Sequence, residues 1–353
     1  METLKEPLDL SNPRIRETII YEKLDKGKVR CGACKRFCEI LQDRLGFCKT
    51  RKNVRGKLYT IIYGDISSLS ANPIEKKPFY HFHPGSLALT VGSWSCNFIC
   101  PWCQNWEISK SYPDLKRGTY ITPKKFIELM KYYDCQGTSI SFNEPTLLLE
   151  YALDVFELAK IEGYYNTYVT NGYMSEKALR MLAERGLDAM NIDIKGDSGA
   201  VKRYCGVDID RVWENVALAK RLDIHIEITT LVIPGVNDSH ECLKGIGRRI
   251  KNELGKETPW HLSAYYPAYK FDAPLTPLTT LETGRDIGVA QGLQYVYVGN
   301  VPGHPYENTY CPNCHTLLIE RYIFDIRAYN ITAQKTCPKC NEAIPIIGNY
   351  SKG

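Results

Sequence analysis

The feature that most constrains this fold is a series of short apolar runs separated by helical patterns. The runs are rich in β-branched and aromatic residues, as buried strands are. They lie at residues 87–92, 138–142, 164–169, 189–194, 224–233, 260–265 and 294–298. Between them, apolar residues recur at helical spacing, as in Thr146–Glu162 and in a helix opened by Pro123. This alternation predicts an α/β fold with a parallel sheet, either a partial barrel or a doubly wound sheet, with ligands at the carboxyl ends of its strands.

Composition excludes several classes of protein. The chain has 353 residues, 44% hydrophobic and 24% charged, which is ordinary globular composition. No apolar stretch reaches the roughly 20 residues of a membrane span. The first residues, METLKEPLDL, lack a secretory pattern, so we expect a cytoplasmic protein. The net charge of +5 is modest, and the basic run at residues 49–57 is more typical of a solvated face than of a nucleic-acid site.

The fourteen cysteines are more informative, because in such a chain they favour metal ligands or catalytic thiols over disulfides. Eleven of them fall into three tight groups, at the head, at the start of the middle and at the tail. This grouping predicts a Cys-rich N-terminal module at residues 1–84, a catalytic domain at 85–303 and a C-terminal knuckle module at 304–353. Cys135, Cys205 and Cys242 stand apart. We expect them to pack in the core, with Cys205 also a loose candidate for radical chemistry.

The central group is Cys96, Cys100 and Cys103, spaced C-x3-C-x2-C directly after the first predicted strand. Three thiolates on one loop suit three corners of an iron-sulfur cube. Since no fourth cysteine is nearby, one iron stays open to a small molecule, as catalytic zinc sites also keep an open position. The alternative is a zinc site whose fourth ligand comes from Cys135 or His81.

This spacing, with Trp102 before the third cysteine, resembles the radical SAM superfamily. The resemblance implies a partial (β/α)6 TIM-type barrel and a [4Fe-4S] cluster whose open iron chelates S-adenosylmethionine (SAM). It also implies a reaction in which reductive cleavage of SAM gives a 5′-deoxyadenosyl radical that abstracts hydrogen from a substrate. The cofactor then carries the chemistry, while the protein supplies position and excludes water.

The same resemblance assigns polar residues at other strand ends to SAM. Glu144-Pro145 stands where the family has Gly-Gly-Glu-Pro, whose carboxylate receives the SAM ammonium, and Phe142 and Asn143 replace the two glycines. Lys195 is the expected partner of the SAM carboxylate. The implied cofactor contacts are Trp102, Asn143, Glu144, Asn171, Asp193, Lys195 and His261. The alternative interpretation is that these polar groups are satisfied by water or by one another, with Glu144 interacting with a helix dipole.

A closer resemblance rests on four further segments. They read Asn72-Pro-Ile-Glu-Lys-Lys-Pro-Phe-Tyr-His-Phe82, Cys103-Gln-Asn-Trp-Glu-Ile-Ser109, Phe142-Asn-Glu-Pro-Thr146 and Val298-Gly-Asn-Val-Pro-Gly303. They are similar to the radical SAM enzyme of the AmmeMemoRadiSam system, a relative of pyruvate formate-lyase activating enzymes. This resemblance implies association with Memo-type and AMMECR-type proteins and an electron donor such as ferredoxin or flavodoxin. It does not identify the substrate.

The tail group consists of two Cys-Pro-x-Cys knuckles, Cys311/Cys314 and Cys337/Cys340. Knuckles flanking a hairpin-like segment, Leu317–Phe324, predict a zinc ribbon, with rubredoxin-like iron as the competitor. His315 and Asn341 stand where such knuckles usually place glycine. The metal would supply much of the module's folding energy.

The head group is less specific. Four cysteines lie within 18 residues, at Cys31, Cys34, Cys38 and Cys48. They suit either a structural zinc or a second iron-sulfur cluster, because ligand softness does not distinguish the two. We expect His81 and His83 to pack or to face substrate rather than to bind this metal.

Three classes of function compete. The first is a radical SAM enzyme, either one that modifies a small molecule or a protein partner, or an activase that makes a glycyl radical. The second is a metal-binding module that recognises nucleic acid, for which we expect salt-dependent binding. The third is an electron-transfer protein without an open iron. The enzyme is favoured, because the other two leave the polar strand ends without a role.

Overall fold

The computed structural model describes residues 8–113 and 118–351 and divides the chain into two compact units. Unit 1 comprises Met1–Ala71, Leu89–Ile99 and Cys103–Asp188. Unit 2 comprises Asn72–Ala88, Cys100–Trp102 and Ala189–Gly353. Both units contain parallel strands joined by helices, which confirms the predicted α/β class. The partial barrel stays a prediction.

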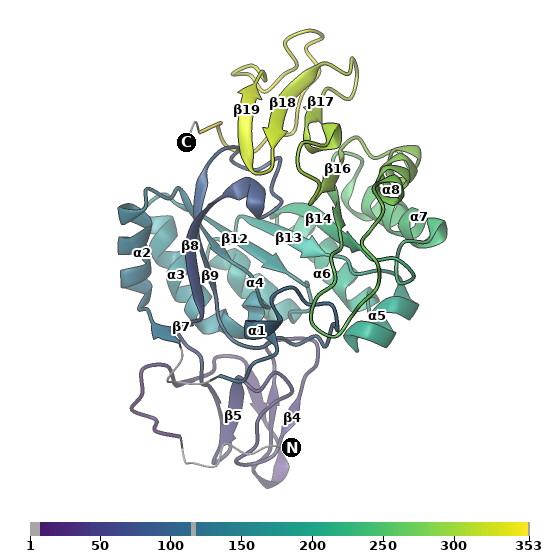
Figure 1. The fold of residues 1–353 in the computed structure, drawn as a ribbon. Coiled ribbons are helices and arrows are strands. Elements are labelled where there is room, and N and C mark those ends of the chain that lie inside the picture. Colours follow the sequence, from purple (N-terminus) through teal and green to yellow (C-terminus); the bar gives the residue numbers. More distant parts are fainter. Residues whose placement is uncertain (1–7, 114–117, 352–353) are drawn as a thin grey trace. The chain divides into compact units, whose positions relative to one another are not determined.

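The N-terminal part of unit 1 is built from short strands in small sheets (Figure 1). Strand orders are β1-β6-β5, β2-β3-β4 and β10-β7. The strands are β1 (Arg16–Glu17), β2 (Tyr21–Lys23), β3 (Val29–Cys31), β4 (Glu39–Ile40), β5 (Arg51–Val54), β6 (Lys57–Thr60), β7 (Asp65–Ile66) and β10 (Thr119–Tyr120). A buried bidentate ion pair ties this part to the helical layer, with the two guanidinium nitrogens of Arg51 lying 2.7 and 2.8 Å from the Glu150 carboxylate.

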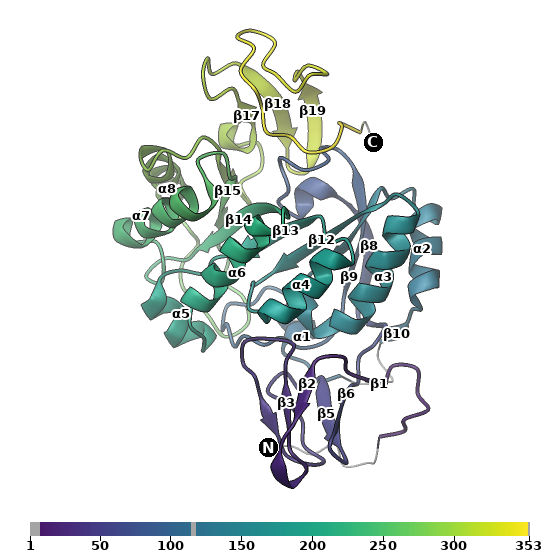
Figure 2. The ribbon, with the colours of Figure 1, turned by 180° about the vertical axis from the view of Figure 1, so that it is seen from behind.

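The rest of unit 1 forms a strand-and-helix layer. Strand β11 neighbours β9 and pairs in parallel with β12, and α2, α3 and α4 lie along one face of these strands (Figures 1 and 2). The elements are β9 (Leu87–Gly92), α1 (Trp106–Ser109), α2 (Pro123–Tyr132), β11 (Gly137–Ile140), α3 (Leu149–Ile161), β12 (Tyr165–Thr170) and α4 (Glu176–Glu184). Thr122 and Ser175 cap the starts of α2 and α4 by accepting hydrogen bonds from backbone amides. Strand β8 (Ser68–Pro73) leads the chain onward into unit 2.

Unit 2 continues the alternation with four parallel strands in the order β13-β14-β15-β16. Its elements are β13 (Ala189–Asp193), α5 (Ser198–Cys205), α6 (Asp210–Arg221), β14 (His225–Val232), α7 (His240–Arg249), β15 (Trp260–Ala264), α8 (Leu278–Ala290) and β16 (Val296–Gly299). Figures 1 and 2 show α6, α7 and α8 beside these strands. Asp197 caps α5, and Gly206 ends it in the left-handed conformation that a helix terminus favours.

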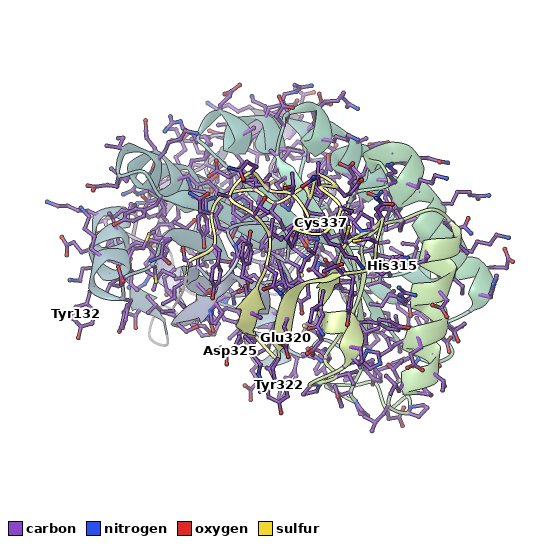
Figure 3. The ribbon with its side chains drawn as sticks, turned by 90° about the horizontal axis from the view of Figure 1, so that it is seen from above. Tyr132, His315, Glu320, Tyr322, Asp325 and Cys337 are labelled. Atoms are coloured by element: carbon purple, nitrogen blue, oxygen red, sulfur yellow. The ribbon has the colours of Figure 1, made fainter. Side chains whose placement is uncertain are left out.

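The C-terminal part of unit 2 is a three-stranded antiparallel sheet, β17-β18-β19. Its strands are β17 (Thr309–Tyr310), β18 (Leu317–Tyr322) and β19 (Asp325–Tyr329). Its small core contains Leu318 and Ile319 together with two cysteines of the tail group. In Figure 3, the labelled Glu320, Tyr322 and Asp325 lie along the β18–β19 hairpin, while Cys337 lies in the loops beyond it.

Two predicted elements need correction. The segment Leu317–Phe324 is one strand and a turn rather than a hairpin, because the chain reverses only at the left-handed Ile323, with φ of +61°, and pairs with residues 325–329. The helix expected over Thr146–Glu162 is divided, since a 3-10 turn (Pro145–Leu148) precedes α3. In the described residues, no helix combines the length and apolar character that crossing a membrane requires.

Candidate functional site

The loop after β9 carries the three central cysteines, and Asn143 holds the start of this loop in place. Its Oδ1 atom accepts a hydrogen bond of 3.0 Å from the Ser93 amide. Its Nδ2 atom donates to the carbonyl oxygens of Trp94 at 3.2 Å and Ser95 at 2.9 Å. Asn143 therefore positions the cysteine loop, a role that the sequence did not reveal because its partners lie about 50 residues away in the chain.

Phe142 adopts a backbone conformation that glycine favours. Its φ of +70° lies in the left-handed region, which is rare for a bulky residue. The Phe142 carbonyl accepts a 2.7 Å hydrogen bond from Asn105, and the next amide, of Asn143, donates to Ser141 at 2.9 Å. These two hydrogen bonds help to hold the backbone at Phe142 in this conformation.

Glu144 is only 1% exposed and organises the loops around it. Its carboxylate accepts from the Thr146 amide at 3.1 Å, the Thr170 hydroxyl at 2.9 Å and the Asn171 amide at 2.9 Å. Burial raises the pKa of Glu144, and this effect outweighs the hydrogen bonds, which lower it. Because Glu144 also caps the 3-10 turn before α3, part of the structural interpretation holds, and its contact with SAM stays a prediction.

Asn171 links this carboxylate to the cysteine loop. Its Nδ2 atom lies 2.7 Å from Oδ1 of Asn97 and 3.8 Å from Sγ of Cys96. Asn97 is fully buried, and its own Nδ2 atom has no hydrogen-bond partner in the described part of the chain. A buried donor beside a predicted cluster ligand is an arrangement that a polar ligand would satisfy.

Cys103 lies against the short helix α1. Its Sγ atom is 3.0 Å from the Ser109 hydroxyl at the end of that helix. The Ile108 carbonyl in turn accepts from the Ser95 amide at 2.9 Å. Helix α1 therefore braces both ends of the cysteine loop.

Cys100 and Trp102 belong to unit 2, with other predicted site residues. The Sγ atoms of Cys100 and Cys205 are 3.5 Å apart, and Lys195 donates to Asp193 at 2.8 Å. Burial would lower the pKa of Lys195, but Asp193 and the two thiols outweigh burial and raise it. Trp102 is 2% exposed and packs in the core of this unit.

Two polar atoms, one at the carboxyl end of β13 and one inside β14, are also unsatisfied. Asp193 and Thr229 are neighbours in the parallel register. Asp193 Oδ1 and Thr229 Oγ1 are buried and make no hydrogen bond within the described residues. The carboxyl ends of parallel strands are where α/β folds bind ligands, so the free oxygen of Asp193 fits a contact to a polar group of a cofactor.

His261 is 2% exposed and is engaged within the protein. Its Nε2 atom lies 2.7 Å from Oε2 of Glu227, and its ring stacks on Tyr297 at a centroid distance of 5.3 Å. The structural role that a strand histidine commonly has is therefore present. The predicted contact of His261 with the SAM ribose stays a prediction.

Glu227 is a buried anion that sequence reasoning missed. It also accepts from His225 at 3.1 Å and from the backbone amides of Tyr80 at 3.0 Å and His81 at 2.8 Å. Burial would raise the pKa of Glu227, but the hydrogen bonds from His225 and His261 outweigh burial and lower it. The available signal was a carboxylate inside a β-branched run, because such a residue must find partners.

Arg321 of β18 is a buried cation in the same unit. It donates to the Tyr80 carbonyl at 3.0 Å and to the Thr309 hydroxyl at 2.7 Å, and its guanidinium lies 4.1 Å from the centre of the Tyr80 ring. His81 lies in this region too. Its ring nitrogens contact the Pro345 carbonyl at 3.1 Å and the Tyr297 hydroxyl at 2.7 Å.

The tail cysteines form a compact four-thiol cluster. Their sulfur atoms all lie within 4.8 Å of one another, with Cys311–Cys340 at 3.5 Å and Cys314–Cys337 at 3.6 Å. Tetrahedral Zn–S bonds of about 2.3 Å require S···S separations of roughly 3.8 Å, which this cluster fits. The residues in the glycine positions, His315 and Asn341, both adopt left-handed conformations, with φ of +58° and +60°.

The head cysteines are mostly buried, and three of their sulfurs accept backbone hydrogen bonds. The donors are Ala33 to Cys31, Arg36 to Cys34 and Phe47 to Cys38. Burial raises the pKa of Cys31 to about 11. Metal binding would supply the missing stabilisation of a thiolate here. The group also contacts the central loop, because Arg36 Nε donates to the Asn97 carbonyl at 2.6 Å.

Comparisons with known proteins agree with this picture. Residues 94–243 match the model of the Radical SAM superfamily. "Uncharacterized protein MJ0808" of Methanocaldococcus jannaschii is 44% identical over 335 residues, covering 94% of this chain and 100% of the relative. MJ1227 of the same organism, whose name describes a glycyl-radical enzyme activating enzyme, is 23% identical over 176 residues, covering 48% of this chain and 71% of that protein.

A solved structure is also similar over part of the chain. It is a domain of pyruvate-formate lyase-activating enzyme from Bacteroides vulgatus, with a TM-score of 0.41 and 19% identity. The similarity covers 46% of this chain and 99% of that domain. At these values the likeness does not extend to substrate or partner.

Proposed function

The chain belongs to the Radical SAM superfamily, in one family with MJ0808, and from this premise we propose that it binds a [4Fe-4S] cluster on Cys96, Cys100 and Cys103. The observation that carries the proposal is the three-cysteine loop, whose sulfurs each have a polar neighbour: Asn171, Cys205 and Ser109, respectively. With SAM, the bound cluster would supply reductive cleavage to a 5′-deoxyadenosyl radical.

The residues proposed to contact SAM differ in whether their polar atoms already have hydrogen-bond partners within the described residues. Asp193 Oδ1 and the ammonium of Lys195 suit the polar groups of the amino acid and ribose, because the first is an unsatisfied buried acceptor and the second a retained cation. Asn171 stands beside Cys96 in unit 1. Asn143 and Glu144 would act mainly by holding the loop, since their polar atoms already have partners.

The substrate is proposed at the level of class. The sequence resemblance to the AmmeMemoRadiSam enzyme supports a protein partner of Memo or AMMECR type. The similarity to MJ1227 supports a second candidate, activation of a glycyl-radical enzyme. Transfer of deuterium from a labelled partner into 5′-deoxyadenosine distinguishes the two, because only the true hydrogen donor labels it.

The flanking cysteine groups are proposed to be structural or accessory metal sites. The tail group, with its short sulfur separations, supports zinc. The head group supports either zinc or a second iron-sulfur cluster. On this view, residues 1–84 and 304–353 are metal-stabilised modules at the ends of a catalytic domain at 85–303.

The test is anaerobic reduction of cluster-loaded protein with dithionite in the presence of SAM. We expect 5′-deoxyadenosine and methionine in equal amounts, and we expect Cys100→Ser to lose more of this activity than the roughly 10–100-fold that loss of an outer-shell partner of a metal ligand costs. Cys135→Ser is the matched control, because that thiol is buried beside the Tyr133 carbonyl and belongs to no cysteine group. Cluster-loaded wild type that cleaves no SAM would exclude the proposal.

A further inference from the structure

Cys205 lies in direct contact with one of the three cysteines of the central loop. Its Sγ atom is 3.5 Å from Sγ of Cys100, within the hydrogen-bond range of sulfur, and the residue is fully buried. Cys100 is itself only 6% exposed. The two thiols therefore share a space from which water is largely excluded.

Packing of aromatic rings holds Cys205 in this place. Trp102 follows Cys100 by two residues, and its ring centre lies 5.3 Å from that of Tyr204, the residue before Cys205. Phe271 closes the group, at 5.4 Å from Trp102 and 5.7 Å from Tyr204. The contact between Trp102 and Tyr204 therefore holds the cysteine loop against the end of α5. It lies two residues from Cys100 and one residue from Cys205.

Unit 2, which contains both thiols, also contains the ion pair between Lys195 and Asp193. Lys195 donates a 2.8 Å hydrogen bond to the carboxylate of Asp193. Asp193 is the last residue of β13, and Lys195 lies in the loop that follows. Asn237 fixes that loop by donating a 3.0 Å hydrogen bond to the Lys195 carbonyl. The observed neighbour of the Cys100 sulfur in this unit is therefore the thiol of Cys205.

We propose that Cys205 is a positioning residue that donates a hydrogen bond from its thiol to the Cys100 sulfur and thereby raises the reduction potential of the cluster. The inference rests on the proposed function, because it requires iron on Cys100. An iron-bound sulfur carries no proton, so Cys205 is the donor in this pair. Hydrogen bonds to cluster sulfurs stabilise the more negative, reduced state, and burial strengthens them.

The test is an EPR-monitored redox titration of the cluster in the absence of SAM. We expect Cys205→Ala to shift the equilibrium constant for reduction about tenfold toward the oxidised cluster, which corresponds to about 59 mV for a one-electron couple. Cys205→Ser retains a donor, so its potential should lie closer to wild type. Cys242→Ala removes another buried cysteine, on α7, and should leave the potential unchanged.

A second measurement reports the proton itself. In D2O, electron-nuclear double resonance of the reduced cluster should show an exchangeable proton that is present in wild type and Cys242→Ala but absent in Cys205→Ala. Equal potentials and equal proton signals in the two alanine variants would overturn the inference. Loss of iron in Cys205→Ala alone would also overturn it, because Cys205 would then be a ligand. Absence of any [4Fe-4S] signal in wild type would instead reject the proposed function.

Discussion

Phe142 combines a bulky side chain with a backbone conformation that glycine favours. Its φ of +70° is the conformation that glycine adopts without cost. The hydrogen bond from Asn105 to its carbonyl and the amide network of Asn143 hold it there. His315 and Asn341 make the same substitution in the tail knuckles. Strain of this kind persists only where the surroundings determine the backbone.

Replacing Phe142 by glycine or by alanine removes the aromatic ring in both cases. The two variants therefore differ mainly in their backbone preference. The left-handed region costs an L-residue about 1 kcal/mol or more relative to glycine. We therefore expect Phe142→Gly to be about 1 kcal/mol more stable than Phe142→Ala in urea denaturation. The same pair at Phe126, inside α2, should show the opposite order, because glycine disfavours a helix by about 1 kcal/mol. Equal stabilities at position 142 would contradict the strain.

At this scale, sequence spacing predicted a shared role for the central cysteines, and their binding of a cluster stays a prediction. The sequence was insufficient for residues whose role depends on distant partners. Asn143 was predicted as a cofactor contact, which stays a prediction, and the sequence did not show that its side-chain amide also braces backbone about 50 residues earlier. Glu227 was passed over, because nothing nearby in the sequence shows that His261 and the Tyr80 amide meet it.

At the scale of elements, strand positions followed closely from β-branched runs. The first run coincides with β9 (Leu87–Gly92), and the run at 189–194 contains β13 (Ala189–Asp193). Helix starts were harder to predict from the sequence where a capping residue alters the first turn. Pro145 and the Glu144 cap produce a 3-10 turn before α3, so periodicity alone placed the helix start too early. The hairpin was predicted too early in the chain, because the turn between β18 and β19 contains a left-handed isoleucine, Ile323, which gives no sequence signal for a turn.

The elements β17–β19 offer a test of the tail metal. Their core is small, so metal binding should contribute much of their folding energy. We expect Cys314→Ser to lose about one zinc per chain and to speed hydrogen exchange of the β18 amides at least about tenfold, the equivalent of roughly 1.4 kcal/mol. Metal analysis and exchange followed by mass spectrometry measure the two effects. Full zinc content with unchanged exchange would contradict a structural metal, and Cys242→Ser should behave as wild type.

At the scale of the whole molecule, residues far apart in sequence share one buried polar network in unit 2. Glu227 joins the amides of residues 80 and 81 to His225 and His261. Arg321 reaches the other side of the same peptide at Tyr80. The periodicity of the sequence cannot predict such a network, because each of its residues alone resembles an ordinary polar residue within an apolar run. The network becomes evident only in the three-dimensional structure.

This network gives stability a defined pH dependence. The pKa of Glu227 is lowered below its ordinary 4.5, so its contribution is fully present above the unfolded value and is lost as pH falls through the lower, folded one. We expect Glu227→Gln to cost about 3 kcal/mol near neutral pH, since it disrupts a buried network. The difference from wild type should narrow below about pH 4.5. Urea denaturation at several pH values measures it, and a difference that stays constant would contradict this assignment.

The contact between Arg321 and Tyr80 also limits how this protein can be dissected. A truncated chain ending near residue 303 would retain all seven proposed SAM contacts yet lack Arg321. The peptide group between Tyr80 and His81, whose N–H donates to Glu227 and whose carbonyl accepts from Arg321, would then lose this guanidinium partner. We therefore expect residues 1–303 alone to fold less stably than the full chain, so shortened versions of this protein should keep the tail through at least Arg321.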